Sequence, residues 1–292
     1  MTDQLAELKS TYIEHYLQGT TMVPQTWRPM YQWRTDQTPV LKVAAYTGIG
    51  EPPEWDGSSD IDYTVAEDLG NTLLQGVDYA LQVRVKRRDT KYVSNVVADL
   101  GRRLGIAFES LKGTIAAAVL NGAFTTTVTG DSLSLINDSH TKRTGTRDNK
   151  LATAFDRTAF FAMLALARAW EDYEGLDYDM GDLGWYLWYQ NTTAGMEEDV
   201  GEVFGSAVSS GQNQLNVAGQ YNVTPVGWAK LTSSTSWGMI SKAETPLIFW
   251  EEDAPEDNTM IDPDNLGTKI TVSAAFKAGV RPTPDGAFGS TY

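Results

Sequence analysis

Apolar residues recur every three or four positions from residue 92 to residue 120, the longest run of this kind in the sequence. Such spacing collects apolar side chains on one face of an α-helix. The run therefore predicts a helix of about eight turns that ends at Asn121-Gly122. Glycines within it, including Gly101 and Gly105, lower its intrinsic helix propensity, which is consistent with another element packed close against it.

Shorter apolar patterns predict three further helices, at residues 3–17, 157–173 and 194–204. Alternating or continuous apolar runs predict short strands at residues 183–189, 221–226, 236–240, 245–250 and 268–276. The last dozen residues are expected to form a loop. Because the strands cluster rather than alternate strictly with helices, the predicted fold class is α+β.

Residues 40–83 are predicted to form one long β-hairpin. Apolar and polar residues alternate on either side of a segment rich in glycine and proline, and a third alternating run, residues 79–85, leads into a basic stretch. A long hairpin cannot bury much of its own surface. We therefore expect it to lie on a partner surface.

Residues 19–39 read as an irregular arm that carries Trp27, Tyr31 and Trp33. Disordered tails are usually poor in aromatic residues, so we expect the arm to dock on a surface. That surface could belong to its own domain or to another molecule, and the sequence leaves both arrangements open.

The composition excludes several kinds of protein. The 292 residues include no cysteine and two histidines, which rules out a disulfide scaffold, a thiolate or multi-histidine metal site and a cysteine nucleophile. No apolar run reaches the ~18 residues that a membrane span requires. The formal net charge is -15, whereas a dedicated nucleic-acid binder is normally basic.

Motifs that would carry chemistry are weak. The sequence has no phosphate-binding glycine loop and no nucleophile elbow, and the acidic residues 172–182 lack the spacing of an EF-hand. His140 follows Asp138, but nothing nearby supplies the nucleophile or held water that a general base needs. A hydrogen-bonded structural histidine is the better interpretation, and no catalytic residue, cofactor or metal site is predicted.

The charge pattern around the hairpin is the most informative feature. Residues 43–83 contain no lysine or arginine but eight acidic residues, Glu51, Glu54, Asp56, Asp60, Asp62, Glu67, Asp68 and Asp78. Residues 84–112 hold eight basic residues against three acidic ones, a net charge of +5, namely Arg84, Lys86, Arg87, Arg88, Lys91, Arg102, Arg103 and Lys112. The acidic hairpin could pair with the basic segment of its own chain or with that of a neighbouring copy.

Four features, in this order, resemble the major capsid proteins of tailed bacteriophages, which have the Hong Kong 97 fold, and most of all the Mu-like major head subunit family. They are Glu54-Trp55-Asp56-Gly57, the strand from Tyr79 to Arg88, the helix at 92–120, and Gly130-Asp131-x-x-x-Leu135-x-x-x-x-His140. Ser132 stands where that family has glycine, and Ile136 where it has phenylalanine. The ordered set, which covers almost the whole chain, carries the resemblance.

The resemblance implies an α+β Hong Kong 97-type capsid fold with four parts: an N-terminal arm at 1–38, an extended loop (the β-hairpin) at 39–83, a peripheral domain at 84–154 and 241–292 with its spine helix at 92–120, and an axial domain at 155–240. In that fold the extended loop lies over the peripheral domain of an adjacent subunit, which would give the acidic hairpin a basic partner. The expected inter-subunit contacts are Trp27, Trp33, Glu51, Glu54, Trp55, Asp56, Asp60, Asp62, Arg84, Lys86, Arg87, Arg88, Arg102 and Arg103.

The function that the resemblance implies is structural. Such a protein self-assembles into the hexamers and pentamers of an icosahedral head that encloses double-stranded DNA, is located in the virion, and is assembled in the cytoplasm of the host bacterium. The expected partners are further copies of the chain, a portal, a decoration protein, and packaged DNA through weak non-specific proximity, with no membrane. Because only about 40 residues precede the hairpin, a separate scaffolding protein is expected. No lysine lies between Lys42 and Arg84. We therefore do not expect a covalent cross-link through a lysine of the extended loop.

Other functions remain open at this stage. An encapsulin-like nanocompartment shell would have the same fold around a cargo enzyme. An acidic glycoside hydrolase could use carboxylates that the sequence does not single out. A carbohydrate-binding protein could use some of the 31 aromatic residues, although aromatic residues are more often part of the core. The sequence also leaves open whether Arg102 and Arg103 face a neighbouring subunit or the lumen.

Overall fold

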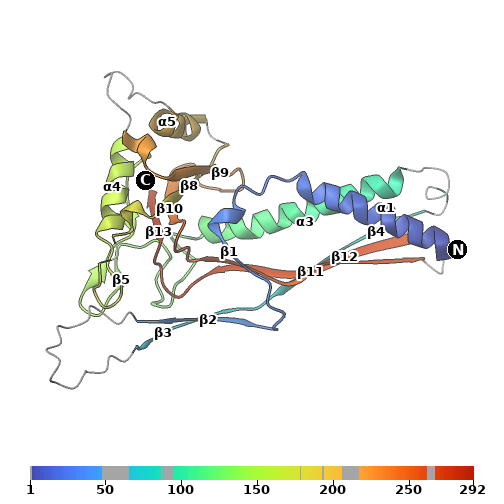
Figure 1. Ribbon diagram of the computed structural model, residues 1–292, viewed down its shortest axis with the longest axis horizontal. Coiled ribbons are helices and arrows are strands. Elements are labelled where there is room, and N and C mark those ends of the chain that lie inside the picture. Colours follow the sequence, from blue (N-terminus) through green and yellow to red (C-terminus); the bar gives the residue numbers. More distant parts are fainter. Residues whose placement is uncertain are drawn as a thin grey trace, which may run out of the picture.

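The computed structural model describes residues 2–47, 66–86, 88, 95–177, 179–192, 194–205, 217–261 and 267–292. A long helix lies along a long sheet, a second body with its own sheet and helices stands at one end, and a hairpin runs beside the first sheet (Figure 1).

The longest helix, α3 (Val96–Asn121), confirms the helix expected at 92–120 over the residues described. It packs on a four-stranded sheet of order β1-β11-β12-β4, in which β1 runs parallel to β11 and the other neighbours are antiparallel. The strands are β1 (Gln32–Arg34), β4 (Val77–Val85), β11 (Leu247–Ile261) and β12 (Thr268–Val280).

Helix α1 (Thr2–Thr21) crosses α3 at very short range. A Cβ atom built on Gly101 would lie 2.7 Å from the carbonyl oxygen of Tyr12, and one built on Gly105 would lie 2.2 Å from that of Tyr16. Only glycine permits so close an approach. The glycines that weaken the intrinsic propensity of α3 therefore make room for α1.

The N-terminal arm docks on its own subunit, one of the two arrangements that the sequence leaves open. The Trp27 ring stacks on that of Trp228 with centroids 5.8 Å apart and tilts against that of Phe249 at 5.3 Å. The Tyr31 hydroxyl donates a hydrogen bond to the carbonyl oxygen of Ala116, at 2.7 Å. A short 3-10 turn, η1 (Arg28–Met30), then leads into β1.

The predicted hairpin is present in β2 (Leu41–Tyr46) and β3 (Asp68–Leu74), which pair antiparallel with an irregularity near Tyr46. Leu74 is buried with Ile248 and Trp250 of β11 in a small apolar cluster that also holds Leu41 and Val43 in part. The hairpin thus rests on the face of the four-stranded sheet opposite α3. The remainder of the expected hairpin, residues 48–65, lies outside the described residues.

The second body is built on a five-stranded sheet of order β7-β13-β10-β8-β9. Its strands are β7 (Lys150–Leu151), β8 (Trp185–Tyr189), β9 (Val223–Gly227), β10 (Ser236–Ser241) and β13 (Ala287–Thr291). A second buried cluster joins this sheet to helices α4 (Arg157–Arg168) and α5 (Ala194–Phe204). Three smaller elements are β5 (His140–Thr141), paired with β6 (Thr146–Arg147), and the 3-10 turns η2 (Met180–Asp182) and η3 (Val217–Gln220).

Two predicted elements were misplaced. The alternating run at residues 79–85 belongs to β4, which pairs with β12 and is not part of the hairpin. The helix expected at 157–173 ends at Arg168, after which the chain turns and buries Trp170 in the second core.

The expectation of a C-terminal loop is wrong, because β13 pairs with β10 on one side and with β7 on the other. This strand therefore lies in the sheet of the second body, whereas the expected boundaries placed all of 241–292 with the spine helix. Strand β7 lies in that sheet as well, although the expected boundaries placed residues 84–154 with the spine helix.

Candidate assembly surfaces

The basic residues predicted to contact a neighbouring subunit lie at one end of the molecule. Arg84, Lys86 and Arg88 are exposed at the end of β4. Arg102 and Arg103 are exposed near the start of α3, where their guanidinium groups lie 2.5 Å and 2.8 Å from the carboxylate of Asp99. The hydrogen bond from Arg102 and the nearby charge of Arg103 lower the pKa of Asp99. Arg102 and Arg103 thus share the carboxylate of Asp99.

The other residues predicted to form contacts between the acidic loop and the basic segment lie outside the described residues. These are Arg87 and the acidic and aromatic residues of the loop, Glu51, Glu54, Trp55, Asp56, Asp60 and Asp62. The described ends of the hairpin, at Tyr46 and Asp68, lie at the opposite end of the molecule from the end of β4 at Val85 (Figure 1). The described acidic residues next to the loop, Glu67 and Asp68, are therefore remote from the basic end of their own chain.

Trp27 was expected at an inter-subunit contact, and its position corrects that expectation. Its side chain is 2% exposed within its own subunit, so it has no surface left to offer a neighbour. Trp33 is half-buried against Phe249, with ring centroids 4.5 Å apart, and the guanidinium of Arg28 covers its ring at 4.3 Å. Both tryptophans hold the arm to the spine core.

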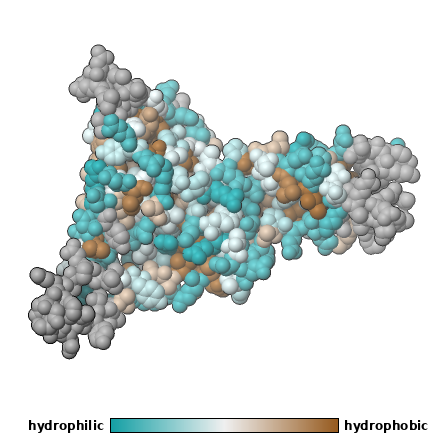
Figure 2. Space-filling view, viewed as in Figure 1, coloured by the Kyte–Doolittle hydropathy of each residue, from teal (hydrophilic) through white to brown (hydrophobic). Residues whose placement is uncertain are grey.

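Exposed apolar side chains mark a surface that the sequence did not single out. On and beside β2 and β3, Val40, Tyr46 and Leu73 are 43%, 63% and 65% exposed. Ile13 and Leu17 are exposed on α1, and Figure 2 shows hydrophobic surface in the part of the molecule that α1 and α3 form. Exposed apolar groups of this kind often mark protein–protein contacts. The alternation of apolar and polar residues along the sequence does not distinguish such exposed positions from buried core positions.

A buried group of charged residues joins the arm, the spine helix and the sheet. Lys112 Nζ lies 2.7 Å from Glu251 Oε1 and 3.2 Å from Glu109 Oε1, and the three side chains are 7%, 12% and 8% exposed. The amide of Gln25 donates a hydrogen bond to Glu109. Burial, with Glu109 and Glu251 nearby, raises the pKa of Tyr16 on α1. This cluster was not predicted from the sequence, because a Glu and a Lys three residues apart on a helix usually form a solvated pair.

The Gly130-to-His140 motif folds into a hydrogen-bonded turn around the carboxylate of Asp131. Oδ1 accepts hydrogen bonds from the Thr129 hydroxyl, at 2.6 Å, and from the N–H of Leu133, at 3.2 Å. Oδ2 lies 2.7 Å from Nδ1 of His140 and accepts a longer bond from the N–H of Thr141. Among the described residues, the hydrogen-bonding partners of this carboxylate come from residues 129–141.

The electrostatics of this turn favour the ionised carboxylate. Burial alone would raise the pKa of Asp131, but the hydrogen bonds from His140 and Thr129 outweigh it and hold that pKa well below its usual range. His140 is fully buried, and its Nε2 lies 3.2 Å from the carbonyl oxygen of Leu135. Both ring nitrogens therefore face oxygen atoms of residues 131–135. This arrangement agrees with a structural histidine and supplies no nucleophile.

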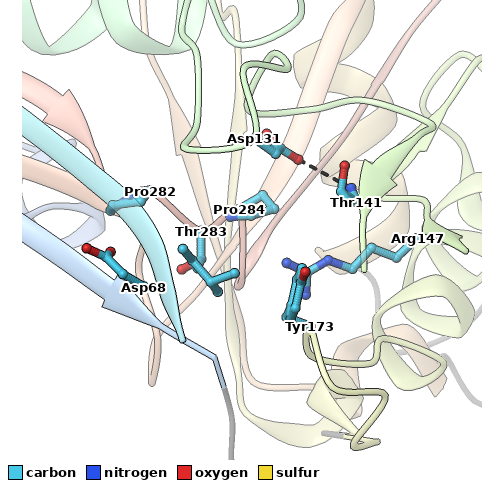
Figure 3. Close-up of a pocket in the computed structure, with 9 residues that line it drawn as sticks. Asp68, Asp131, Thr141, Arg147, Tyr173, Pro282, Thr283 and Pro284 are labelled. Atoms are coloured by element: carbon cyan, nitrogen blue, oxygen red, sulfur yellow. Dashed lines mark hydrogen bonds between the residues drawn. The ribbon is translucent and has the colours of Figure 1, made fainter. Parts of the chain in front are cut away.

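A cavity of about 260 Å³ lies beside this turn, between the hairpin and the second body (Figure 3). The Arg147 side chain reaches it from β6, buried over the ring of Trp170 and bonded to Asp285 at 2.8 Å. The lining residues are Asp68, Leu69, Asp131, Thr141, Arg147, Tyr173, Pro282, Thr283 and Pro284. At this cavity the carboxylate of Asp131 is bonded to His140 and the guanidinium of Arg147 to Asp285.

The part of the chain that the structure describes contains no group of three or more histidine and acidic residues placed to hold a metal ion. None of its helices is long and apolar enough to cross a membrane.

No known protein family and no curated protein matches this sequence, but its fold matches solved structures. The chain is similar to the capsid of Ralstonia phage GP4, with a TM-score of 0.59 and 13% identity over 90% of this chain and 87% of that one. It is similar to the capsid of the cyanophage P-SCSP1u, with a TM-score of 0.56 and 11% identity over 91% and 87% of the two chains.

A third similar structure is the holo-SrpI encapsulin complex from Synechococcus elongatus PCC 7942. The TM-score is 0.54 and the identity 11%, over 92% of this chain and 88% of that one. The similarities extend over about nine-tenths of the chain. The protein therefore has the α+β Hong Kong 97-type capsid fold that the resemblance implied.

Proposed function

We propose that this chain is the structural major capsid protein of a tailed double-stranded DNA bacteriophage, and that it self-assembles into the hexamers and pentamers of an icosahedral head. The observation that carries the proposal is the capsid fold, which the similarity to solved capsid structures shows over nine-tenths of the chain. The role is structural rather than enzymatic. In support, the carboxylate of Asp131 and the guanidinium of Arg147 at the Figure 3 cavity are bonded within the protein, to His140 and Asp285.

The proposed contact between subunits joins the acidic extended loop of one copy to the basic end of the next. Two observations support it. The described ends of the hairpin lie far from the basic end of the same chain (Figure 1), so a second copy is better placed to supply the opposite charge. Exposed Tyr46 and Leu73 on the hairpin would add apolar contact area to that charge pairing.

Several finer assignments belong to the same proposal. The ordered motifs, above all Gly130-Asp131 to His140, favour the Mu-like major head subunit family. The proposed parts are the arm 1–38, the extended loop 39–83, the peripheral domain 84–154 and 241–292, of which β7 and β13 pair in the second sheet, and the axial domain 155–240. A separate scaffolding protein, a portal and a decoration protein are the proposed partners. Packaged DNA lies close without tight binding, in keeping with a net charge of -15, and assembly takes place in the host cytoplasm before the protein becomes part of the virion.

An encapsulin-like shell is the second candidate, and the similarity to the holo-SrpI encapsulin complex favours it. The two candidates share the fold and differ in what the shell encloses. Nuclease-protected double-stranded DNA inside purified particles would support a phage head, whereas a protein cargo without DNA would support the nanocompartment.

Light scattering and negative-stain microscopy of the purified chain test the proposal itself. We expect capsomers or closed shells of defined size. A monodisperse monomer at all concentrations, with or without co-expressed structural partners, would contradict it.

A further inference from the structure

The hairpin of β2 and β3 meets the rest of the subunit at two places. At one end Leu74 packs against Ile248 and Trp250. Near the other end the carbonyl oxygen of Leu69 approaches the α-carbon of Gly130 so closely that a Cβ atom there would lie 2.7 Å from it. Two separated contacts fix both the position and the direction of the hairpin, and the second depends on a residue without a side chain.

Gly130 is itself held in place from two sides. Its N–H donates a hydrogen bond of 2.7 Å to the carbonyl oxygen of Pro282. The next residue, Asp131, is bonded through both carboxylate oxygens, and its Oδ2 faces the fully buried ring of His140 at 2.7 Å. Leu69 also lines the cavity of Figure 3, which lies next to this contact. The position of Gly130 therefore affects where Leu69 rests.

We propose that Asp131 and His140 are a positioning pair that holds Gly130 against Leu69 and so sets the direction in which the hairpin leaves the subunit. The pair acts through backbone placement and touches no neighbouring molecule itself. The inference rests on the proposed function only where it concerns the neighbouring molecule that the extended loop contacts. The geometry of the hairpin on its own subunit does not depend on the proposed function.

The absence of native cysteine makes a direct distance measurement possible. Tyr46→Cys on the hairpin and Leu183→Cys on the second body place two spin labels at exposed positions, 63% and 41% exposed. Double electron–electron resonance then reports the distance between them in the full chain. Labelled chain is diluted into unlabelled chain, so that only pairs within one molecule contribute.

Three variants in this labelled background test the pair. Gly130→Ala adds the Cβ atom that Leu69 leaves no room for, and Asp131→Asn keeps one acceptor oxygen but loses the acceptor that faces His140. Gly201→Ala is the matched control, because a Cβ atom there meets nothing within 4 Å. We expect a shifted or broadened distance distribution for the first two and an unchanged distribution for the control, with circular dichroism like that of the parent.

An unchanged distribution in folded Gly130→Ala and Asp131→Asn would overturn the proposal. If Gly130→Ala does not fold, Asp131→Asn alone decides, since an amide fits the same space. The parent chain's ability to form shells is a separate measurement. If the parent chain forms shells but the hairpin is unshifted in the variants, the positioning pair is refuted and the proposed function stands. If the hairpin shifts in the variants but the parent chain forms no shells, the positioning pair stands and the proposed function is refuted.

Discussion

Replacing Trp27 by alanine should unfold the free subunit more readily, because this side chain belongs to the core of its own chain. It is 2% exposed, and four aromatic rings lie with their centroids within 6.3 Å of it, those of Tyr31, Trp33, Trp228 and Phe249. Truncation of a buried tryptophan to alanine costs about 3–5 kcal/mol. Losing four ring contacts favours the upper part of that range. Such a loss is a large share of the ~5–15 kcal/mol that stabilises a typical protein.

Urea unfolding of the unassembled subunit, followed by tryptophan fluorescence and circular dichroism, measures this loss. Leu17→Ala is the control, because that side chain is 58% exposed on α1 and its removal should change stability by only about 0.5 kcal/mol. A Trp27→Ala subunit as stable as the parent, but unable to assemble, would refute the reasoning. That result would mean that the tryptophan anchors a neighbouring copy, as the sequence alone suggested.

Three further predictions concern charged residues. Lys112→Met leaves the buried carboxylates of Glu109 and Glu251 without their cation and should cost about 3–5 kcal/mol in urea unfolding at neutral pH; a loss below 1 kcal/mol would mean that water reaches the cluster. The lowered pKa of Asp131 means that its carboxylate contributes stability above its unfolded pKa of about 4 and loses that contribution as the pH falls further. The difference in unfolding free energy between the parent and Asp131→Asn should therefore shrink below pH 4, and a constant difference from pH 7 to pH 2 would contradict the assignment. Reversing the exposed Arg102 and Arg103 to glutamate should leave the circular dichroism and thermal unfolding of the subunit near those of the parent while reducing shell formation by light scattering; unimpaired assembly would mean that these arginines do not face a neighbour.

The sequence predicted the parts of the fold that have strong periodicity. The spacing of apolar residues located α3 to within a few residues, because a long amphipathic stripe has few alternative structures. The order of hairpin, strand and spine helix carried the resemblance to the capsid fold. In contrast, β13 was missed because Ala-Phe-Gly-Ser-Thr has no alternation, and its strand conformation depends on pairing with β10 and β7.

The candidate surfaces were harder to predict, because burial is a property of the tertiary structure. The sequence around Trp27 does not show whether its ring is covered by its own chain or by another. The stacking on Trp228 in the structure shows that its own chain covers it. The partnership of Lys112 with Glu251 joins residues 139 positions apart, a separation that no local pattern reveals. The need for glycine at position 130 likewise comes from the distant Leu69.

The most direct test of the central claim is electron cryomicroscopy of the particles that this chain forms. The account predicts closed shells in which one chain occupies both five-fold and six-fold capsomers, with the acidic extended loop of each copy on the basic end of an adjacent copy. Discrete monomers or small closed oligomers, in which the loop lies on the basic segment of its own chain, would contradict it.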